Sequence, residues 1–428
     1  DIQQYLDEAA ANNQKIKYII ETHSHADFVS GHLELAGKTG AEIVFGQKAK
    51  TTFPTHLVKD GDILTIGKIN LKFLETPGHT PEGITILAED SENPGEPLKM
   101  FTGDTLFIGD VGRPDLVGSK GFTAEQMGSM LYDSLHEKIL PLPDETEVYP
   151  SHGAGSLCGK SLSKETWSTL GEQKKVNYAL KPMTKEEFIQ VVAANQPEVP
   201  AYFPISATQN LKGSLALDQL PKPAKLKTEE IVNFDGVVID LRQNSDFGDG
   251  HIPNSINIGL SGQFASWAGT LIPIGTPVAL VVDNMEQVEE GFMRLARVGI
   301  ETVKGFILIK DYSGKTKNIE QVPVEKVNDL LEANEIQFVD VRRIPEFNSG
   351  HALQTMNIPL DKLSRELEKL DPTRPTYLIC QSGFRSSIGT GILENAGFEK
   401  IYNVTGGTKA WIEAGLETES SLAACAKS

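Results

Sequence analysis

The sequence is poor in cysteine and in basic residues, and it has no long apolar run. Its 428 residues include three cysteines, Cys158, Cys380 and Cys425, too few for a disulfide framework. With no signal-peptide pattern, they predict a reducing cytoplasm. Lys and Arg number 40 against 58 Asp and Glu, and the formal charge of −18 argues against a nucleic acid or an anionic membrane as partner. No apolar run reaches the roughly 20 residues that span a bilayer. This length predicts two or three domains.

A short polar segment follows the first predicted strand. Residues 16–20 are apolar, as in a buried strand, and His23, His25 and Asp27 come directly after them. Functional side chains are common at such strand exits because the sheet holds the loop in place. Neutral imidazole and carboxylate are ligands for iron, zinc or manganese. By itself the pattern also fits a polar turn with hydrogen-bonded histidines.

Three later strand ends carry the same residue types. His79 lies in the turn after residues 69–74, Asp104 ends the apolar run 100–104, and His152 follows the strand near 148–150. Polar residues that fall repeatedly at strand exits favour a metal centre over a set of unrelated turns.

Other patterns predict local structure. A Gly-Lys turn pairs the strands 63–66 and 69–74, and residues 31–40 are typical of a helix that ends at glycine. A capping box starting at Thr184 begins a helix that runs to about Ala194. The Pro- and Gly-containing stretch 197–223 predicts irregular chain that wraps the first domain and becomes a linker.

The second half contains a duplication with a spacing of 100 residues. Seven residues recur at this spacing: Asp240, Arg242, Phe247, Gly250, His251, Asn257 and Ile258 return as Asp340, Arg342, Phe347, Gly350, His351, Asn357 and Ile358. Each copy begins with a helix (228–233 and 324–332) and continues with a strand. Alternating strands and helices predict a parallel sheet in each copy.

The copies differ in one loop. In the second copy an apolar strand ends at Cys380, and residues 380–386 open a helix. Consecutive backbone N–H groups before a helix form an anion-binding cup, and the helix N-terminus with Arg385 should favour a nucleophilic thiolate. The alternative is a buried inert cysteine. The aligned residues of the first copy are Val282, Met285 and Gln287 in place of Cys380, Gly383 and Arg385.

The ordered histidines and aspartates of the first half resemble the metallo-β-lactamase superfamily, an α/β fold built as an αβ/βα sandwich. The resemblance covers about residues 1–210. The superfamily has strands before its first helix that are absent here, so we expect a leading segment to be missing. Its usual motif is H-x-H-x-D-H, and Phe28 replaces the last histidine, which normally binds a second metal. The resemblance with this substitution implies one metal per chain.

Within the metallo-β-lactamase superfamily, three neighbouring motifs resemble those of the persulfide dioxygenases. The motifs are G-D-T-L-F at 103–107, G-D-V-G-R-P-D at 109–115 and P-A-Y-F-P at 200–204. The resemblance implies one Fe(II) per chain with three coordination positions open for a substrate sulfur and O₂. The implied iron ligands are His23, His79 and Asp104. The implied neighbours that orient these ligands or bind water are His25, Asp27 and His152.

Two residues near this site have two interpretations each. Arg113 is a candidate contact for the carboxylate of a thiol substrate, or it is a structural arginine. Cys158 either lines the pocket or packs as a small apolar side chain.

The repeated motifs, with G-G-x3-W-x3-G-L at 406–416, resemble the rhodanese fold. The copies span about 224–315 and 319–420, after a linker at 211–223. The resemblance implies structural roles for the two repeated histidines and an inactive first copy that spaces or docks the second. The loop C-x-x-G-x-R implies catalytic roles for Cys380 and Arg385. The other implied contacts to the sulfur substrate are Gln381, Ser382, Gly383, Phe384 and Ser386.

The whole architecture resembles persulfide dioxygenase–rhodanese fusions of bacterial sulfide detoxification. This implies oxidation of a low-molecular-weight thiol persulfide by O₂ to sulfite and thiol, and a sulfurtransferase that interconverts persulfide and sulfite with thiol and thiosulfate. The implied thiol is glutathione, coenzyme A or bacillithiol, and the implied assembly is a cytoplasmic dimer or tetramer. One alternative is a dinuclear zinc thioester hydrolase of the glyoxalase II type with a rhodanese sulfur carrier. Another is a pure sulfur carrier that relays persulfide through Cys380.

Overall fold

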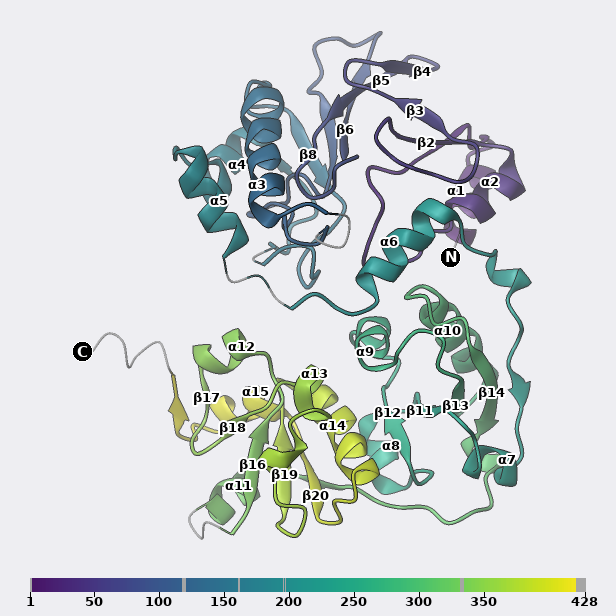
Figure 1. Ribbon diagram of the computed structural model, residues 1–428, viewed down its shortest axis with the longest axis vertical. Coiled ribbons are helices and arrows are strands. Elements are labelled where there is room, and N and C mark those ends of the chain that lie inside the picture. The colour runs from purple at the N-terminus through teal and green to yellow at the C-terminus, as the bar shows by residue number, and fades with distance from the viewer. Residues whose placement is uncertain are drawn as a thin grey trace, which may run out of the picture. The chain divides into compact units, whose positions relative to one another are not determined.

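The computed structural model describes residues 2–117, 121–160, 162–194, 196, 198–331 and 335–420 (Figure 1). The chain divides into two compact units. One comprises Asp1–Leu220 with Arg297–Gly299, and the other comprises Pro221–Ala296 with Ile300–Ser428. Among the helices of the described residues, none has the length and apolar character needed to cross a bilayer.

The first unit contains two sheets. A six-stranded sheet has the order β4-β5-β6-β7-β8-β9, and a three-stranded parallel sheet has the order β1-β2-β3. The predicted hairpin is confirmed, because Ile66 pairs with Ile69. The strands are β1 (Tyr18–Ile20), β2 (Glu42–Gly46), β3 (His56–Val58), β4 (Ile63–Ile66), β5 (Ile69–Glu75), β6 (Ile84–Asp90), β7 (Lys99–Gly103), β8 (Glu147–Pro150) and β9 (Ser168–Thr169).

Helices cover the outer faces of both sheets, which gives the predicted αβ/βα sandwich. Val44 and Val58 of the small sheet pack against Phe73 of the large sheet, and this cluster fills the space between them. In Figure 1, α3 and α5 lie side by side, and their Leu131 and Phe188 belong to the core on the far face of the large sheet. The helices are α1 (Gln3–Ala11), α2 (His32–Thr39), α3 (Ala124–Asp133, continued by a π-helical turn Ser134–Ile139), α4 (Leu170–Val176), α5 (Lys185–Ala193) and α6 (Phe203–Lys212).

Two helix predictions are confirmed, and one prediction of irregular chain is wrong. α2 ends at Gly40 in the left-handed conformation, and α5 begins with the capping box of Thr184 and Glu187. The stretch 197–223, of which Pro197 lies outside the described residues, contains α6. Pro204 stands in the first turn of α6, where the missing N–H has no intrahelical partner to lose. That proline therefore starts a helix here, and it does not mark an irregular segment.

The second unit consists of two five-stranded parallel sheets with the same topology, as the duplication predicts. In chain order the strands of each copy lie in the order 1-5-4-2-3, namely β10-β14-β13-β11-β12 and β15-β20-β19-β16-β18. The strands are β10 (Ala224–Lys225), β11 (Val237–Asp240), β12 (Ser255–Asn257), β13 (Val278–Val282), β14 (Val303–Leu308), β15 (Glu320–Val322), β16 (Gln337–Asp340), β18 (Met356–Asn357), β19 (Thr376–Ile379) and β20 (Ile401–Val404), with a small antiparallel pair of β17 (His351–Ala352) and β21 (Thr418–Glu419).

Helices surround both of these sheets. Those of the first copy are α7 (Thr228–Val232), α8 (Asn244–Asp249), α9 (Phe264–Leu271) and α10 (Met285–Ala296). Those of the second copy are α11 (Val324–Leu331), α12 (Ile344–Ser349), α13 (Leu360–Leu363), α14 (Phe384–Asn395) and α15 (Gly407–Glu413). The predicted helices at the start of each copy are confirmed as α7 and α11, and residue 332 of that prediction lies outside the described residues.

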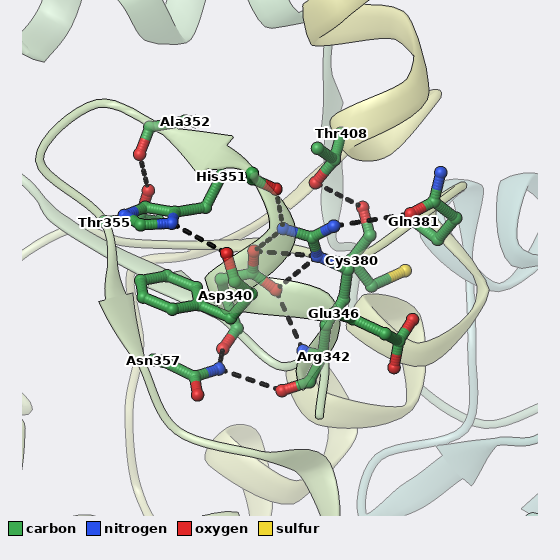
Figure 2. A network of polar contacts seen from close by, with 12 residues as sticks. Asp340, Arg342, Glu346, His351, Ala352, Thr355, Asn357, Cys380, Gln381 and Thr408 are labelled. Carbon is green, nitrogen blue, oxygen red and sulfur yellow. Dashed lines mark hydrogen bonds and ion pairs between the residues drawn. The ribbon is translucent and has the colours of Figure 1, made fainter. Parts of the chain in front are cut away.

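The residues that recur build one hydrogen-bond network twice. In the second copy Arg342 donates to Asp340 and to the Gly350 carbonyl, and the Asn357 amide donates to the Asp340 and Arg342 carbonyls (Figure 2). The first copy repeats each of these bonds. His351 and the matching His251 each use Nδ1 on a carbonyl four residues earlier. Both histidines are structural, as predicted.

A candidate metal centre and a candidate cysteine site

Three buried side chains from three loops converge in the first unit. Ligand atoms of His23, His79 and Asp104 all lie within 4.8 Å of one another. Asp104 Oδ2 is 3.3 Å from His79 Nε2 and 3.7 Å from His23 Nε2. His23 follows β1, His79 lies between β5 and β6, and Asp104 follows β7. The sheets therefore deliver the three ligands to one point.

Several polar atoms of this cluster have no hydrogen-bond partner among the described residues. They include His23 Nε2 and both carboxylate oxygens of Asp104. An unpaired buried polar atom costs about 1 to 3 kcal/mol, so a cluster of them indicates a missing partner. Nitrogen and carboxylate donors at this spacing fit a divalent transition metal. The residues present therefore fit the metal that the sequence predicts.

The surrounding chain sets the orientation of the ligands. His79 Nδ1 donates to the carbonyl of Arg113 at 3.0 Å, which leaves the lone pair on Nε2. His23 Nδ1 lies 3.0 Å from the Thr22 hydroxyl. Gly112 permits this close packing, because a Cβ at that position would lie 1.9 Å from the Asp104 carbonyl oxygen. This contact explains the second glycine of the G-D-V-G-R-P-D motif.

The electrostatics favour the forms of these side chains that bind metal. Burial lowers the pKa of His23 well below its usual range and also lowers the pKa of His79. Burial alone would raise the pKa of Asp104, but His152, His23 and His79 together hold it well below its ordinary value. Neutral imidazoles face a carboxylate, which is the protonation pattern of a metal site.

The predicted neighbours form a second group beside the first. Ligand atoms of His25, Asp27 and His152 also lie within 4.8 Å of one another. His152 Nε2 stands between the groups, 3.4 Å from Asp27 Oδ2 and 3.5 Å from Asp104 Oδ2. Phe28, which offers no ligand atom, stacks on the His25 ring at 4.5 Å between ring centroids.

Arg113 and Cys158 both lie close to this centre and are both buried. Arg113 donates to both carboxylate oxygens of Asp115 at 2.7 Å, so its charge already has a partner in the chain. Its contact with a substrate stays a prediction. Cys158 groups with Asp104 and His152, and burial, with the charges of Asp27 and Asp104, raises the pKa of its thiol. It lies next to the centre as a neutral thiol.

Sequence reasoning missed Asn210, which holds the loop after β1 that carries His23 and His25. The Asn210 amide, on α6, donates to the carbonyls of His25 and Phe28 at 2.8 and 2.7 Å and accepts from the Ser30 N–H at 2.8 Å. A side chain 180 positions along the chain therefore pins the loop at three points. No local pattern signals this role, because Asn210 lies in the stretch predicted to be irregular.

Two buried glutamates near the centre were missed as well. Glu21 Oε2 lies 3.4 Å from His25 Nε2, and its other oxygen accepts from the Ser30 hydroxyl. Glu82 accepts from the Ser24 N–H at 3.1 Å and from the Ser24 hydroxyl. Both carboxylates brace the loop that carries His23 and His25.

In the second unit the cysteine loop forms a cup before α14. Cys380 follows β19, and its sulfur accepts from the Gly383 N–H at 3.1 Å and lies 3.4 Å from the Ser386 hydroxyl. Gly383 has a φ of +100°, which favours glycine. The Thr408 N–H donates to the Cys380 carbonyl, and Figure 2 shows this residue beside the cysteine.

The remaining loop residues differ in exposure and contacts. Gln381 and Ser382 are exposed, whereas Phe384 is half-buried and Ser386 is fully buried. The Gln381 amide oxygen accepts from Arg342 at 3.4 Å (Figure 2). The predicted loop cation, Arg385, donates to both oxygens of Glu346 at 2.7 and 2.6 Å. Sequence reasoning missed Glu346.

Comparison with known proteins identifies both kinds of domain. The metallo-beta-lactamase superfamily model matches residues 2–152, and the rhodanese-like domain model matches residues 323–414. The chain is 30% identical over 199 residues to the mitochondrial persulfide dioxygenase ETHE1 of Mus musculus, which covers 46% of this chain and 69% of that protein. The chain belongs to the persulfide dioxygenase family. As a member of this family, it carries an additional rhodanese-like domain after the metal domain.

The chain is also similar to two proteins that carry other names. A crystal structure of a metallo-beta-lactamase from Staphylococcus aureus subsp. aureus COL is 31% identical, with a TM-score of 0.64, over 72% of this chain and 88% of that one. The hydroxyacylglutathione hydrolase of Dictyostelium discoideum is 32% identical over 138 residues, which is 32% of this chain and 48% of that protein. The first similarity extends well beyond the metal domain, and the second lies within a shorter stretch.

Proposed function

We propose that residues 1–210 form a mononuclear non-haem Fe(II) persulfide dioxygenase, and that residues 319–420 form a sulfurtransferase. The dioxygenase reaction consumes R–S–SH, O₂ and H₂O and yields R–SH, sulfite and two protons. The observation that carries the proposal is the buried trio of His23, His79 and Asp104, in which His23 Nε2 and both Asp104 carboxylate oxygens lack hydrogen-bond partners among the described residues. Membership of the persulfide dioxygenase family supports the same substrate class.

Each group of the first site has a proposed role. Fe(II), when bound by two histidines and one carboxylate on one face, supplies open positions for the substrate sulfur and O₂. Asp27 and His152, which are 3.4 Å apart and partly exposed beside the trio, would bind water and exchange protons with it. His25, braced by Glu21, orients the loop of His23.

The second site carries sulfur on Cys380. The thiolate attacks the outer sulfur of a persulfide R–S–S⁻, a Cys380–S–S⁻ persulfide forms, and R–S⁻ leaves. Sulfite then attacks the outer sulfur, thiosulfate forms, and the Cys380 thiolate returns. The reverse sequence makes persulfide from thiosulfate. The N–H groups of the loop stabilise the anionic sulfur in both steps.

The fusion links the two activities through sulfite and persulfide, because one chain raises the effective concentration of a shared intermediate. We assign this coupled activity to sulfide detoxification in a bacterial cytoplasm. The carrier thiol belongs to the class of glutathione, coenzyme A and bacillithiol. The proposed assembly is a dimer or a tetramer.

The decisive experiment measures metal content and O₂ uptake on anaerobically purified protein. We expect about one iron per chain and consumption of O₂ with glutathione persulfide, with sulfite as product. His79→Ala should lose iron and O₂ uptake and keep the transfer of sulfur by Cys380. Iron-loaded protein that consumes no O₂ with any of the three thiol persulfides would contradict the proposal.

A second candidate is a dinuclear thioester hydrolase. The group of His25, Asp27 and His152 offers a second set of ligand atoms, and a hydroxyacylglutathione hydrolase is among the relatives. Phe28 stands against it, because the superfamily motif places a ligand histidine there. Two zinc ions per chain with hydrolysis of S-lactoylglutathione and no O₂ uptake would establish this candidate.

A further inference from the structure

The cysteine loop contains one charged side chain, and that charge is already paired. Residues 380–386 read Cys-Gln-Ser-Gly-Phe-Arg-Ser, so Arg385 is their only cation. Its guanidinium, 14% exposed, makes two parallel hydrogen bonds to Glu346, whose side chain is 36% exposed. Burial raises the pKa of Glu346, but the hydrogen bonds and charge of Arg385, with smaller contributions from Arg343 and Arg342, together outweigh burial and lower the pKa, so the carboxylate is charged.

A second guanidinium near the loop, that of Arg342, is also paired with a carboxylate. Arg342, which contacts Gln381, donates to both oxygens of the buried Asp340. A sulfur donor that enters this loop therefore meets backbone N–H groups and a neutral ion pair.

Two classes of donor respond differently to this arrangement. The outer sulfur of a thiol persulfide fits the N–H cup around Cys380 and needs no cation for itself. Thiosulfate is a dianion whose SO₃ group binds best to a free guanidinium and is repelled by a carboxylate. Both donors transfer their outer sulfur to Cys380 by the same reaction. The Cys380 thiolate attacks the outer sulfur, an S–S bond to Cys380 forms, and the thiolate or sulfite leaves with the electron pair.

We infer that Glu346 is a specificity-determining residue that, by neutralising Arg385, makes the cysteine loop prefer thiol persulfides to thiosulfate as sulfur donors. The inference rests on the proposed sulfurtransferase function and names its substrate preference. Glu346 acts through Arg385 and is a positioning residue. For the same reason, we expect the Cys380 persulfide to transfer its sulfur more slowly to sulfite than to an uncharged thiol.

The substitution Glu346→Gln tests the charge and leaves the fold in place. Glu346 also accepts from the Arg343 N–H at 3.1 Å at the start of α12, and a glutamine oxygen keeps that bond. We expect kcat/KM for thiosulfate to rise about tenfold and to fall more steeply with added salt, whereas kcat/KM for glutathione persulfide stays within twofold. Glu346→Asp, which keeps the charge, should retain the preference of the wild type.

The first copy supplies a matched control. Asp246 stands at the position of Glu346, and Gln287 replaces the arginine there. Asp246→Asn should leave kcat/KM unchanged for both thiosulfate and glutathione persulfide. An unchanged ratio of the two kcat/KM values in Glu346→Gln, or an equal loss with both donors, overturns the inference. A wild-type protein inactive with both donors instead overturns the sulfurtransferase function itself.

Discussion

The two copies of the second unit share a fold and differ in one loop. Both place an Asp-x-Arg pair and an Asn amide in the same hydrogen-bond network and build the same strand order. At the end of the fourth strand, Cys380 has Val282 as its counterpart, and Val282 is fully buried in β13. The residues that build the shared fold are therefore different from the residues of the proposed cysteine site.

The backbone of the corresponding loop also differs between the copies. Gly383 precedes α14 with a positive φ, whereas the aligned Met285 is the first residue of α10 and does not have a positive φ. Gln287, in place of the loop arginine, accepts from the Asp283 N–H at 2.7 Å. A side chain of the first copy thus occupies a backbone donor in the region where the second copy leaves a cup for sulfur.

The first copy still contacts the helix behind the active loop. The Ser387 hydroxyl on α14 donates to Asn257 at 2.7 Å, and Glu394, two turns later, lies 3.2 Å from His251. Both partners belong to the network that the copies share. The copy that lacks the cysteine therefore has the residues that contact α14.

The largest expected effect comes from removing the nucleophile. Cys380→Ser should reduce sulfur transfer by at least about a thousandfold, because a hydroxyl is not ionised at neutral pH and cannot carry sulfane sulfur. O₂ uptake at saturating persulfide should remain. The measurement is thiosulfate formation from glutathione persulfide and sulfite.

Restoring a cysteine in the first copy sharpens the same comparison. Val282→Cys in the Cys380→Ser background should restore no activity, because that copy lacks the loop glycine and the arginine. Recovery of even a few per cent of the transfer rate would show that the surrounding loop is not required. Loss of O₂ uptake in Cys380→Ser would favour the pure sulfur-carrier alternative.

A smaller effect is expected from changing the shape of the loop. Gly383→Ala places a side chain at a φ of +100°, which costs about 1 to 3 kcal/mol and displaces the N–H that faces the sulfur. Sulfur transfer should fall about 10- to 100-fold. Gly397→Ala is the control, because Gly397 has a φ of +89° at the other end of α14. It should lower the melting temperature similarly and leave kcat/KM unchanged. Equal losses of activity in both variants would count against the cup.

The smallest effect concerns the contact between the copies. Burial raises the pKa of Glu394, but hydrogen bonding and charge from His251, with Lys317, outweigh it and lower the pKa. A carboxyl with a lowered pKa in the folded state stabilises above its unfolded value, and this contribution is lost as pH falls through the folded value. Glu394→Gln should cost about 1 kcal/mol at pH 7. Its calorimetric transition should then converge with that of the wild type below about pH 4.5.

An exposed glutamate on α15 is the control for this experiment. Glu413→Gln removes an acid whose side chain is 66% exposed and should leave the pH dependence unchanged. If the melting temperatures of Glu394→Gln and the wild type change with pH in parallel, the contact with His251 contributes no pH-dependent stability.

Residues that act through local backbone position could be predicted from the sequence. The histidines and aspartates at the strand exits were found because each follows a strand, and the family resemblance selected the trio of His23, His79 and Asp104 among them. The cysteine loop was found because its N–H groups, glycine and arginine lie within seven residues. The duplication predicted the parallel sheets, since a repeated pattern must build a repeated unit. In each of these cases the physical cause is contained in a short stretch of chain.

The tertiary structure alone decided which distant side chains support those sites. Asn210 reaches the metal loop across 180 positions, and Glu346 meets Arg385 across 39. A hydrogen bond or an ion pair depends on distance in space, and the folded sheets bring these residues together without leaving a periodic or spaced pattern behind. The local chemistry of both sites can therefore be read from the chain, whereas the partners that orient and neutralise it exist only in the fold.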